Sequence, residues 1–212
     1  MACRDGHGYD ARHRVCPCFE IMPSALLPES FVTRRLRAER MSSTHLPFIT
    51  AMHADAALMA TMGGTRDATA SRRYVEHNML HWAEHGYGMY VLSERDSGAL
   101  TGRAGLKLTL SGKIERVEIA YAFMPACWGR GHASEITRAL LALGFERLPV
   151  DALSAVAIQA NAASLRVMEK CGMRWIETTG EGEARKLRYE IRRQQWRALA
   201  DEAAPIGANM RS

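Results

Sequence analysis

Residues 117–135 read VEIAYAFMPACWGRGHASE and change from one kind of secondary structure to another within a few positions. Apolar side chains alternate with smaller or polar ones up to Phe123, which predicts a strand. Pro125 interrupts that pattern, and two glycines then flank Arg130. Apolar residues recur at helical spacing over 132–145. The stretch therefore predicts a strand, a glycine turn and a helix in immediate succession.

The flanking sequence predicts further elements of both kinds. Strands are expected over 31–41, 88–93, 99–110, 114–123, 153–158, 173–178 and 186–192, and helices over 46–62, 74–86, 132–145 and 161–171. The three strands between 88 and 123 are separated by short polar turns, which favour antiparallel neighbours. A strand–helix–strand unit follows them. The chain is therefore expected to be an α/β protein with a mixed, mostly antiparallel sheet flanked by helices.

The glycine turn is a candidate anion site. Gly129 and Gly131 allow the backbone to come close to a ligand and to turn its N–H groups inward. The helix that follows adds a partial positive charge at its first turn, which suits a pyrophosphate. The alternative interpretation is a tight connection between a strand and a helix with no ligand. The turn lacks the Gly-Lys-Ser/Thr ending of a P-loop, and it follows antiparallel strands, unlike a dinucleotide fingerprint.

A second helix start follows about thirty residues later in the sequence. Asn161 is a good N-cap, Ser164 lies in the first turn, and Gly172 is suited to the C-terminal cap with Met173 as its apolar partner. Capping alone would explain these residues. Both helices are nevertheless expected to begin at the same edge of the sheet, which would bring Ser164 near the glycine turn.

Composition and charge exclude several classes of protein. The 212 residues are 47% hydrophobic and 24% charged, which is typical of a globular domain, and no apolar run is long enough to span a membrane or to act as a secretory signal. The formal net charge is +5. Residues 1–40 carry +2 and residues 185–212 carry +4, which leaves −1 for the residues between them. A nucleic-acid binder that acts through its basic ends is therefore a weak alternative.

The five cysteines favour a cytosolic, reduced protein, because no CxxC pair is present. Cys3, His7, His13, Cys16 and Cys18 do not have the regular spacing of a zinc site, so no metal is expected. Residues 1–28 are expected to be a disordered extension, 29–198 a single domain and 199–212 a tail. Met22 is a candidate for the true start.

Residues 117–135 resemble the acetyl-CoA motif of the GNAT N-acetyltransferases, and most closely that of the branch typified by RimJ and RimL. Residues 161–173 are similar to the second motif of that branch, and residues 33–37 to its first strand. The resemblance extends from about residue 31 to residue 196. It implies the GNAT acyl-CoA N-acyltransferase fold and acetyl-CoA as co-substrate, and the cysteine pattern favours a cytoplasmic location.

The resemblance also implies how acetyl-CoA is held. Strands 114–123 and 153–158 would splay apart, pantetheine would pair with free backbone groups in the gap, and pyrophosphate would lie on the amides of the glycine turn. The implied cofactor-binding residues are Phe123, Met124, Trp128, Gly129, Arg130, Gly131, His132, Ala133, Asn161 and Ser164. The Arg130 side chain is either a solvated turn residue or a contact to phosphate or adenine.

Acetyl transfer to an amine needs a base, an oxyanion site and an acid. Glu118 is the candidate base, since it lies on the strand face opposite Val117 and Ile119, and partial desolvation strengthens a carboxylate as a proton acceptor. The alternative role for Glu118 is a structural ion pair or a hydrogen bond to a turn. The backbone N–H of Phe123 or Met124 is the candidate for the oxyanion.

Many GNAT enzymes have a tyrosine seven residues after the motif asparagine, whereas this sequence has Met168, which cannot donate a proton. The resemblance leaves Ser164 as the candidate acid; its alternative role is helix capping. Glu135 is expected to cap or pair within its own helix, and His132 to be solvated. Cys127 has no supporting His or Asp nearby and is not expected to be a nucleophile.

The sequence thus predicts an acetyl-CoA-dependent N-acetyltransferase that transfers acetyl directly to a primary amine. The acceptor could be a protein N-terminus or a small amine such as a polyamine or an aminoglycoside. The main alternative is a non-catalytic sensor that binds acyl-CoA. We expect a monomer or homodimer that has no membrane partner and no specific nucleic-acid partner.

Overall fold

The computed structural model describes residues 26–111, 114–182 and 185–203. The cysteine and histidine positions considered for a zinc site lie outside the described residues, as do residues 1–25 of the expected extension and residues 204–212 of the expected tail.

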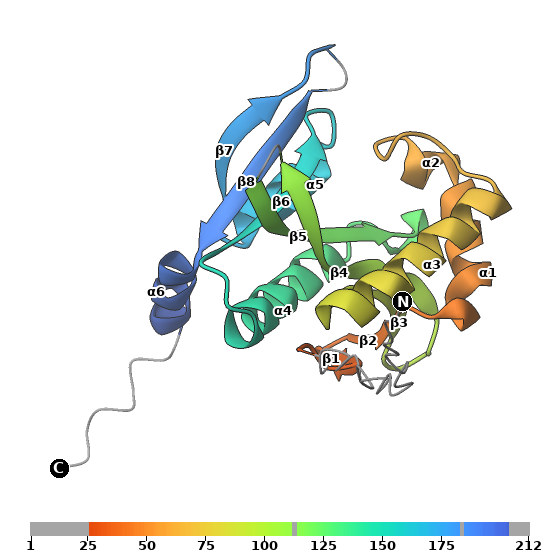
Figure 1. Ribbon diagram of the computed structural model, residues 1–212, viewed down its shortest axis with the longest axis horizontal. Helices are drawn as coiled ribbons and strands as arrows, with labels where there is room; N and C mark the ends of the chain where they lie inside the picture. Colours follow the sequence, from red (N-terminus) through yellow and green to blue (C-terminus); the bar gives the residue numbers. More distant parts are fainter. Residues whose placement is uncertain (1–25, 112–113, 183–184, 204–212) are drawn as a thin grey trace, which may run out of the picture.

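One sheet of eight strands forms the centre of the domain, in the order β1-β2-β3-β4-β5-β6-β8-β7 (Figure 1). The strands are β1 (Ser30–Val32), β2 (Leu36–Arg40), β3 (Met89–Glu94), β4 (Leu100–Ser111), β5 (Ile114–Phe123), β6 (Ala152–Ile158), β7 (Arg174–Thr179) and β8 (Lys186–Arg192). All neighbouring pairs are antiparallel except β5 and β6, which are parallel. This is the mixed, mostly antiparallel sheet that the sequence predicts.

Helices cover both faces of the sheet. They are α1 (Leu46–Ala54), α2 (Ala56–Met59), α3 (Ala68–His85), α4 (His132–Arg147), α5 (Ala162–Lys170) and α6 (Arg193–Ala203), with short 3-10 turns η1 (Ser43–His45) and η2 (Pro125–Cys127). A smaller apolar core packs α1–α3 against one sheet face, and a larger core packs α4 and α5 against the other. In Figure 1, α1, α2 and α3 lie together on the right.

Two predicted elements are divided in the structure. The single strand expected over 31–41 is wrong, because a turn separates β1 from β2, and in it the Thr33 hydroxyl accepts a hydrogen bond of 3.1 Å from the Leu36 N–H. The helix expected over 46–62 is broken at Asp55. The Asp55 carboxylate accepts the N–H of Leu58 at 2.8 Å and thereby caps α2 as a separate helix.

Both ends of the predicted domain extend further than expected. Leu27, placed in the extension by its sequence, is 1% exposed, and its N–H donates to the Gly86 carbonyl at 3.0 Å. At the other end, α6 continues to Ala203. The Trp196 ring stacks on Phe145 of α4 with centroids 6.3 Å apart, which attaches α6 to the domain.

Candidate functional site

Strands β5 and β6 separate towards their carboxyl ends. They share one register pair, Glu118 with Ser154, and the Ser154 hydroxyl donates to the Val117 carbonyl at 3.3 Å. Beyond this contact β5 continues to Phe123 with β4 as its only paired neighbour among the described strands. Because the two strands are parallel, α4 and α5 both begin at the edge where the strands open, as the sequence predicts.

The open edge of β5 carries one of the two amides considered for the oxyanion. The Met124 N–H donates to the Thr101 carbonyl at 2.8 Å and is therefore already used. Successive strand residues direct their N–H groups to opposite edges, so the Phe123 N–H faces the side of β6. The Phe123 carbonyl accepts the indole N–H of Trp128 at 2.7 Å.

The glycine turn has the backbone that an anion site requires. Gly129 and Gly131 have φ of 75° and 79°, in the left-handed region that favours glycine. Gly131 is the N-cap of α4 and contributes no side-chain cap. The N–H groups of the first turn of α4 therefore have no partner within the helix, and the helix dipole adds positive charge there. A Cβ added at Gly129 would meet nothing within 4 Å.

A turn from the other end of the sequence holds this loop in place. The Arg35 guanidinium donates to the Arg130 carbonyl at 2.7 Å and, through Nε, to Glu135 Oε2 at 2.7 Å. Glu135 Oε1 accepts the Thr33 hydroxyl at 2.6 Å and the Arg35 N–H at 2.8 Å. The expectation that Glu135 pairs within its own helix is therefore wrong, because its partners lie in the β1–β2 turn.

The environment of Glu135 stabilises its charged form. Burial alone would raise the pKa of this carboxyl, but the hydrogen bonds from Thr33 and Arg35 and the charge of Arg35 lower it overall. Glu135 thus remains ionised while it joins β1, β2 and α4 beside the glycine turn.

The remaining turn residues divide into exposed and buried ones. The Arg130 guanidinium lies 3.2 Å from Glu94 Oε1, with 56% of its side chain exposed, and Trp128 is 53% exposed. His132 is 5% exposed, so the expectation of a solvated histidine is wrong. Burial and the nearby Arg35 lower the pKa of His132. Its ring lies against Phe123, with centroids 5.9 Å apart.

Glu118 has the placement predicted for it and also an ion-pair partner. It lies opposite Lys107 of β4, with Oε2 3.7 Å from Nζ, and its side chain is 14% exposed. It shares a sheet face with Ala120 and Ala122, which pack with the core formed by α1–α3. Both roles considered for Glu118, base and ion-pair partner, are thus open to it.

The start of α5 confirms Asn161 as an N-cap. Its Oδ1 accepts the Ser164 N–H at 3.1 Å. Its Nδ2 donates to the Thr61 hydroxyl at 3.0 Å, a link across one hundred residues that the sequence does not reveal. Gly172 has φ of 83°, and the Met173 N–H donates to the Met168 carbonyl at 3.0 Å, so the predicted C-terminal cap is also present.

Two hydroxyl groups lie at the start of α5. Ser164 is half-buried, and its carbonyl accepts the Tyr121 hydroxyl at 3.1 Å. Burial raises the pKa of Tyr121 to about 12. Met168 is 2% exposed in the larger core. Tyr121 was not predicted as a site residue, although strand alternation places it two residues before Phe123 on the same face.

Other reactive groups are few in the part of the chain that the structure describes. Burial raises the pKa of the Cys127 thiol, which keeps it protonated. Within residues 26–111, 114–182 and 185–203, no group of three or more metal-ligating side chains is placed to hold a metal ion. None of the helices in those ranges is both long and apolar enough to cross a membrane.

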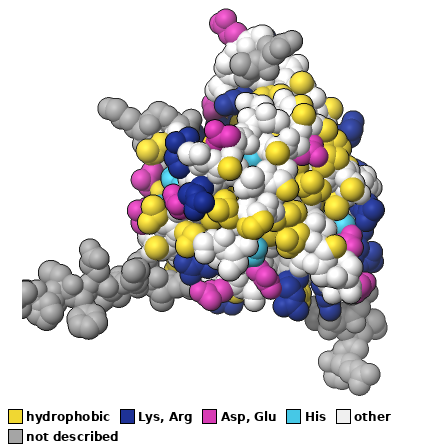
Figure 2. All heavy atoms as spheres, turned by 90° about the vertical axis from the view of Figure 1, so that its right-hand side faces the viewer, with side chains coloured by type: hydrophobic (Ala, Val, Ile, Leu, Met, Phe, Trp, Pro, Cys, Tyr) yellow, Lys and Arg dark blue, Asp and Glu magenta, His cyan; other side chains and the backbone are white. Residues whose placement is uncertain are grey.

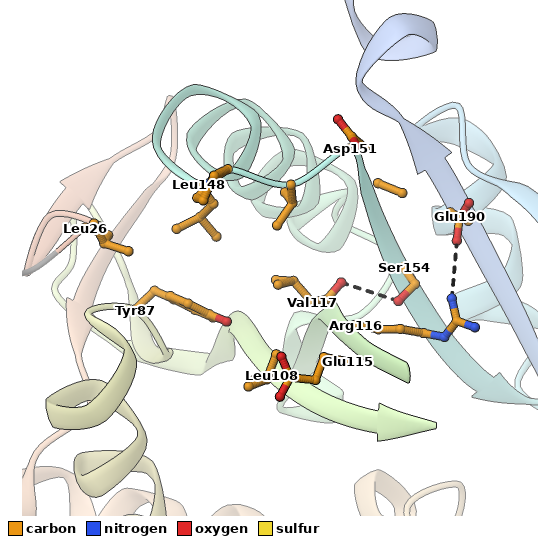
Figure 3. A pocket seen from close by; sticks show the side chains of 13 residues that line it. Leu26, Tyr87, Leu108, Glu115, Arg116, Val117, Leu148, Asp151, Ser154 and Glu190 are labelled. Carbon is orange, nitrogen blue, oxygen red and sulfur yellow. Dashed lines mark hydrogen bonds and ion pairs between the residues drawn. The ribbon is translucent and has the colours of Figure 1, made fainter. Parts of the chain in front are cut away.

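A cavity of about 490 Å³ lies at the other end of β5 (Figure 3). Tyr87, Val117 and Leu148 form its apolar wall, and Glu115 and Asp151 bring carboxylates to it. It lies at the amino-terminal ends of β5 and β6, whereas the glycine turn follows the carboxyl end of β5. The cavity is therefore separate from the open edge.

The sequence model of the Acetyltransferase (GNAT) domain matches residues 35–174. The chain belongs to the GNAT acetyltransferase family. The matched range contains the open edge of β5, the glycine turn and the start of α5. The fold of this GNAT chain thus agrees with the resemblance carried by residues 117–135 and 161–173.

The chain is similar in sequence to one Bacillus protein and in fold to two solved structures whose titles name different acceptors. YkkB of Bacillus subtilis (strain 168) is 29% identical over 124 residues, covering 58% of this chain and 72% of YkkB. A Salmonella typhimurium acetyltransferase described as modifying the N-terminal serine of ribosomal protein L7/L12 is 15% identical, with a TM-score of 0.63 over 76% of this chain and 96% of its own. Spermidine N-acetyltransferase from Vibrio cholerae, solved with CoA and spermine, is 15% identical. Its TM-score is 0.63 over 76% of this chain and 97% of its own.

The two solved structures are similar in fold to the same extent, although their titles name different acceptors. The likeness in fold therefore shows the GNAT architecture but does not select the RimJ/RimL branch.

Proposed function

We propose that this chain is an acetyl-CoA-dependent N-acetyltransferase of the RimJ/RimL type, which transfers acetyl directly to a primary amine of a peptide N-terminus or a small molecule. The observation that carries the proposal is the open edge of β5 next to the glycine turn at the start of α4. An extended thiol arm and a pyrophosphate need these two features side by side.

The residues present fit acetyl-CoA. The amides from Gly129 to Ala133 would bind the pyrophosphate. The remaining backbone groups on the open edge of β5 would pair with the pantetheine, since the Phe123 carbonyl and the Met124 N–H and carbonyl already have partners. Arg130 would move from Glu94 to a phosphate, since its present ion pair is exposed and weak. Trp128, His132, Asn161 and Ser164 complete the proposed binding set.

Acetyl-CoA supplies an acetyl group activated as a thioester. In the proposed mechanism Glu118 takes the proton of the acceptor amine, directly or through a water. Its neighbours on the same face of β5, Ala120 and Ala122, have small side chains, so they would leave room for the amine beside the carboxylate. The Phe123 N–H stabilises the oxyanion, since the Met124 N–H is bonded to Thr101. The amine nitrogen bonds to the thioester carbon, and the carbon–sulfur bond breaks. The Ser164 hydroxyl gives its proton to the departing thiolate and regains one from the newly acylated nitrogen.

The proposal is tested by measuring thiol release from acetyl-CoA with a panel of peptides and amines. We expect E118Q to lower kcat by about 100-fold or more, in line with loss of a general base, with the Kd for acetyl-CoA unchanged. E115Q is the matched control, because Glu115 is an exposed residue of the same strand that lines the separate cavity. It should retain wild-type rates.

Two outcomes would contradict the proposal at different points. A near-wild-type rate in E118Q would remove Glu118 from the mechanism and leave the enzyme in place. Acetyl-CoA binding without thiol release for any amine would instead favour an acyl-CoA sensor.

A further inference from the structure

A buried arginine lies on the sheet face that carries Glu118. Arg103 of β4 is the register partner of Ala122 on β5, and directly opposed residues of antiparallel strands share a face. This face is covered by α1–α3, on the side of the molecule shown in Figure 2, where hydrophobic side chains gather in the middle and Lys and Arg lie mainly towards the edge. Arg103 is therefore on the side of the sheet where the proposed base would meet the acceptor.

The guanidinium of Arg103 contacts one hydroxyl and one thioether, and its Nε is unused among the described residues. Arg103 is 7% exposed, and its Nη1 donates to the Tyr74 hydroxyl at 2.6 Å. Nη2 has the sulfur of Met62 at 3.8 Å, and Nε is buried with no hydrogen-bond partner among the described residues. In that same part of the chain, no carboxylate lies within 4.0 Å of this guanidinium.

The neighbours of Arg103 add positive charge instead of neutralising it. The Arg66 guanidinium lies 5.8 Å from the centroid of the Tyr74 ring, and that of Arg103 lies 4.7 Å from it. His53, whose ring meets Tyr74 edge to face at 4.9 Å, is fully buried. Burial, Arg103 and Arg66 lower the pKa of His53 to about 4, so it is neutral at pH 7.

The hydrogen bonds of His53 define which ring nitrogen is free. The Ser71 hydroxyl donates its single proton to the Asp67 carbonyl at 2.8 Å. It must therefore accept the bond of 2.9 Å from His53 Nδ1. The His53 Nε2 lone pair is left without a partner within the described residues. The cluster thus offers two guanidinium groups and an unused imidazole acceptor.

The cluster is connected to the start of α5. Met62, which contacts Arg103, follows Thr61, whose hydroxyl accepts the Asn161 amide at 3.0 Å. The segment after α2 therefore reaches from Arg103 to the N-cap of the helix that carries Ser164.

A buried cation without a counter-ion is unfavourable. Among the described residues the Nε–Nη2 edge meets only the weak thioether acceptor of Met62, and this edge has the geometry that binds a carboxylate through two parallel hydrogen bonds. We propose that the acceptor amine carries a carboxylate, as an amino acid does, and that Arg103 binds it. The inference rests on the proposed function and narrows it. Polyamines are poor acceptors on this basis, because Arg103 and Arg66 repel them.

The test compares acceptors and products that differ only in the carboxylate. Thiol release is measured with L-amino acids and with the corresponding amino acid amides, and binding of the N-acetyl-L-amino acids and their amides is followed by thermal shift with CoA present. For the side chain that is best accepted, we expect the acid to exceed the amide by at least tenfold in both kcat/KM and affinity. R103M should reduce the acid-to-amide ratio to about one in both kcat/KM and affinity. R103K should give ratios between those of the wild type and R103M.

R73Q is the matched control, since it removes one exposed arginine of α3 next to Tyr74. It should keep the wild-type ratios. If R103M does not fold, Y74F replaces it: Y74F removes the hydroxyl that holds Nη1 and should lower the acid-to-amide ratio severalfold with unchanged acetyl-CoA affinity.

Equal kcat/KM and equal affinity for acid and amide in the wild-type protein would overturn the role of Arg103. A higher kcat/KM for polyamines than for amino acids would overturn it as well. Thiol release with those acceptors would leave the proposed function intact. Absence of thiol release with every amine would count against the proposed function, and product binding alone would then decide whether Arg103 selects a carboxylate.

Discussion

Arg35 and Glu135, one hundred residues apart, form a hydrogen-bonded ion pair through two atoms of each residue. Glu135 Oε2 accepts Arg35 Nε–H at 2.7 Å, and Oε1 accepts the Arg35 backbone N–H at 2.8 Å. Arg35 also donates to the Arg130 carbonyl within the glycine turn. The shape of the proposed pyrophosphate site therefore depends on a contact with the β1–β2 turn.

Replacing Glu135 by glutamine should weaken both the fold and the site. We expect the free energy of unfolding to fall by about 1 to 2 kcal/mol, because charge-assisted bonds to a half-buried carboxylate are lost while partial exposure of Arg35 screens them. The Kd for acetyl-CoA should rise severalfold. Urea unfolding and calorimetric titration measure the two effects. E146Q on the same helix removes only an exposed pair with Arg147 and should change neither.

The contribution of Glu135 also predicts a dependence on pH. Its pKa in the folded chain is lowered from the ordinary value of 4.5. The stabilisation is thus fully present above pH 4.5 and is lost as the pH falls through the folded pKa. The difference in stability between wild type and E135Q should shrink with acidification. A difference that stays constant down to pH 3 would show that ionised Glu135 is not its source.

Ser164 makes its observed hydrogen bonds through its backbone, which allows its hydroxyl to be tested alone. Its N–H donates to Asn161 and its carbonyl accepts the Tyr121 hydroxyl. S164A should therefore leave stability within about 0.5 kcal/mol of wild type and lower kcat by about 100-fold if the hydroxyl is the acid. A kcat within threefold of wild type, together with a large loss in Y121F, would transfer the role to Tyr121.

The two bonds of the Asn161 side chain can be separated by mutation. N161A removes the cap of α5 and the link to Thr61, and should cost about 1 to 2 kcal/mol in unfolding free energy. T61V removes only the link and should cost less than N161A. It should also raise KM for the acceptor and leave KM for acetyl-CoA unchanged, because Thr61 lies on the side of α1–α3. Equal losses in the two variants would mean that the cap contributes nothing.

Local sequence signals predicted most of the fold. Strand alternation identified 114–123 with both of its bounds, and Asn161 and Gly172 marked the ends of α5. The break at Asp55 could be missed because apolar spacing continues through it, while the side-chain cap that divides the helix is a single hydrogen bond. Helix α6 was not predicted, although Trp196 and Leu199 stand three residues apart in the sequence. It is attached to the domain by the Trp196 ring on Phe145, by Arg193 and by Leu199 over Gly172.

The sequence predicted those parts of the site that local structure determines: the glycine turn, the strand face of Glu118 and the Asn161 cap. Two glycines before a helix are sufficient to predict an amide-lined turn. The partner of Glu135 and the burial of His132 depend on the β1–β2 turn, which is distant in sequence. Arg103 in a strand pattern has no signal of its own, because its lack of a counter-ion is a property of the packed helices above it.

His53 should give the protein a second, separate dependence on pH. The folded chain holds it neutral, with a pKa of about 4 against an ordinary 6.5, because it is buried beside Arg103 and Arg66. Between these values the unfolded chain binds a proton that the folded chain does not, so stability falls as the pH drops from 6.5 towards 4. The total loss in the free energy of unfolding that this residue causes is about 3 kcal/mol.

H53N keeps a hydrogen-bond donor for Ser71 but removes the titrating ring. It should reduce the slope of the unfolding free energy against pH by up to about 1.4 kcal/mol per pH unit, and urea unfolding at several pH values measures that slope. H77N, which replaces an exposed histidine, is the control and should keep the wild-type dependence of stability on pH. An unchanged slope in H53N would show that His53 is not neutral by burial, and would weaken the case for an uncompensated cationic cluster around Arg103.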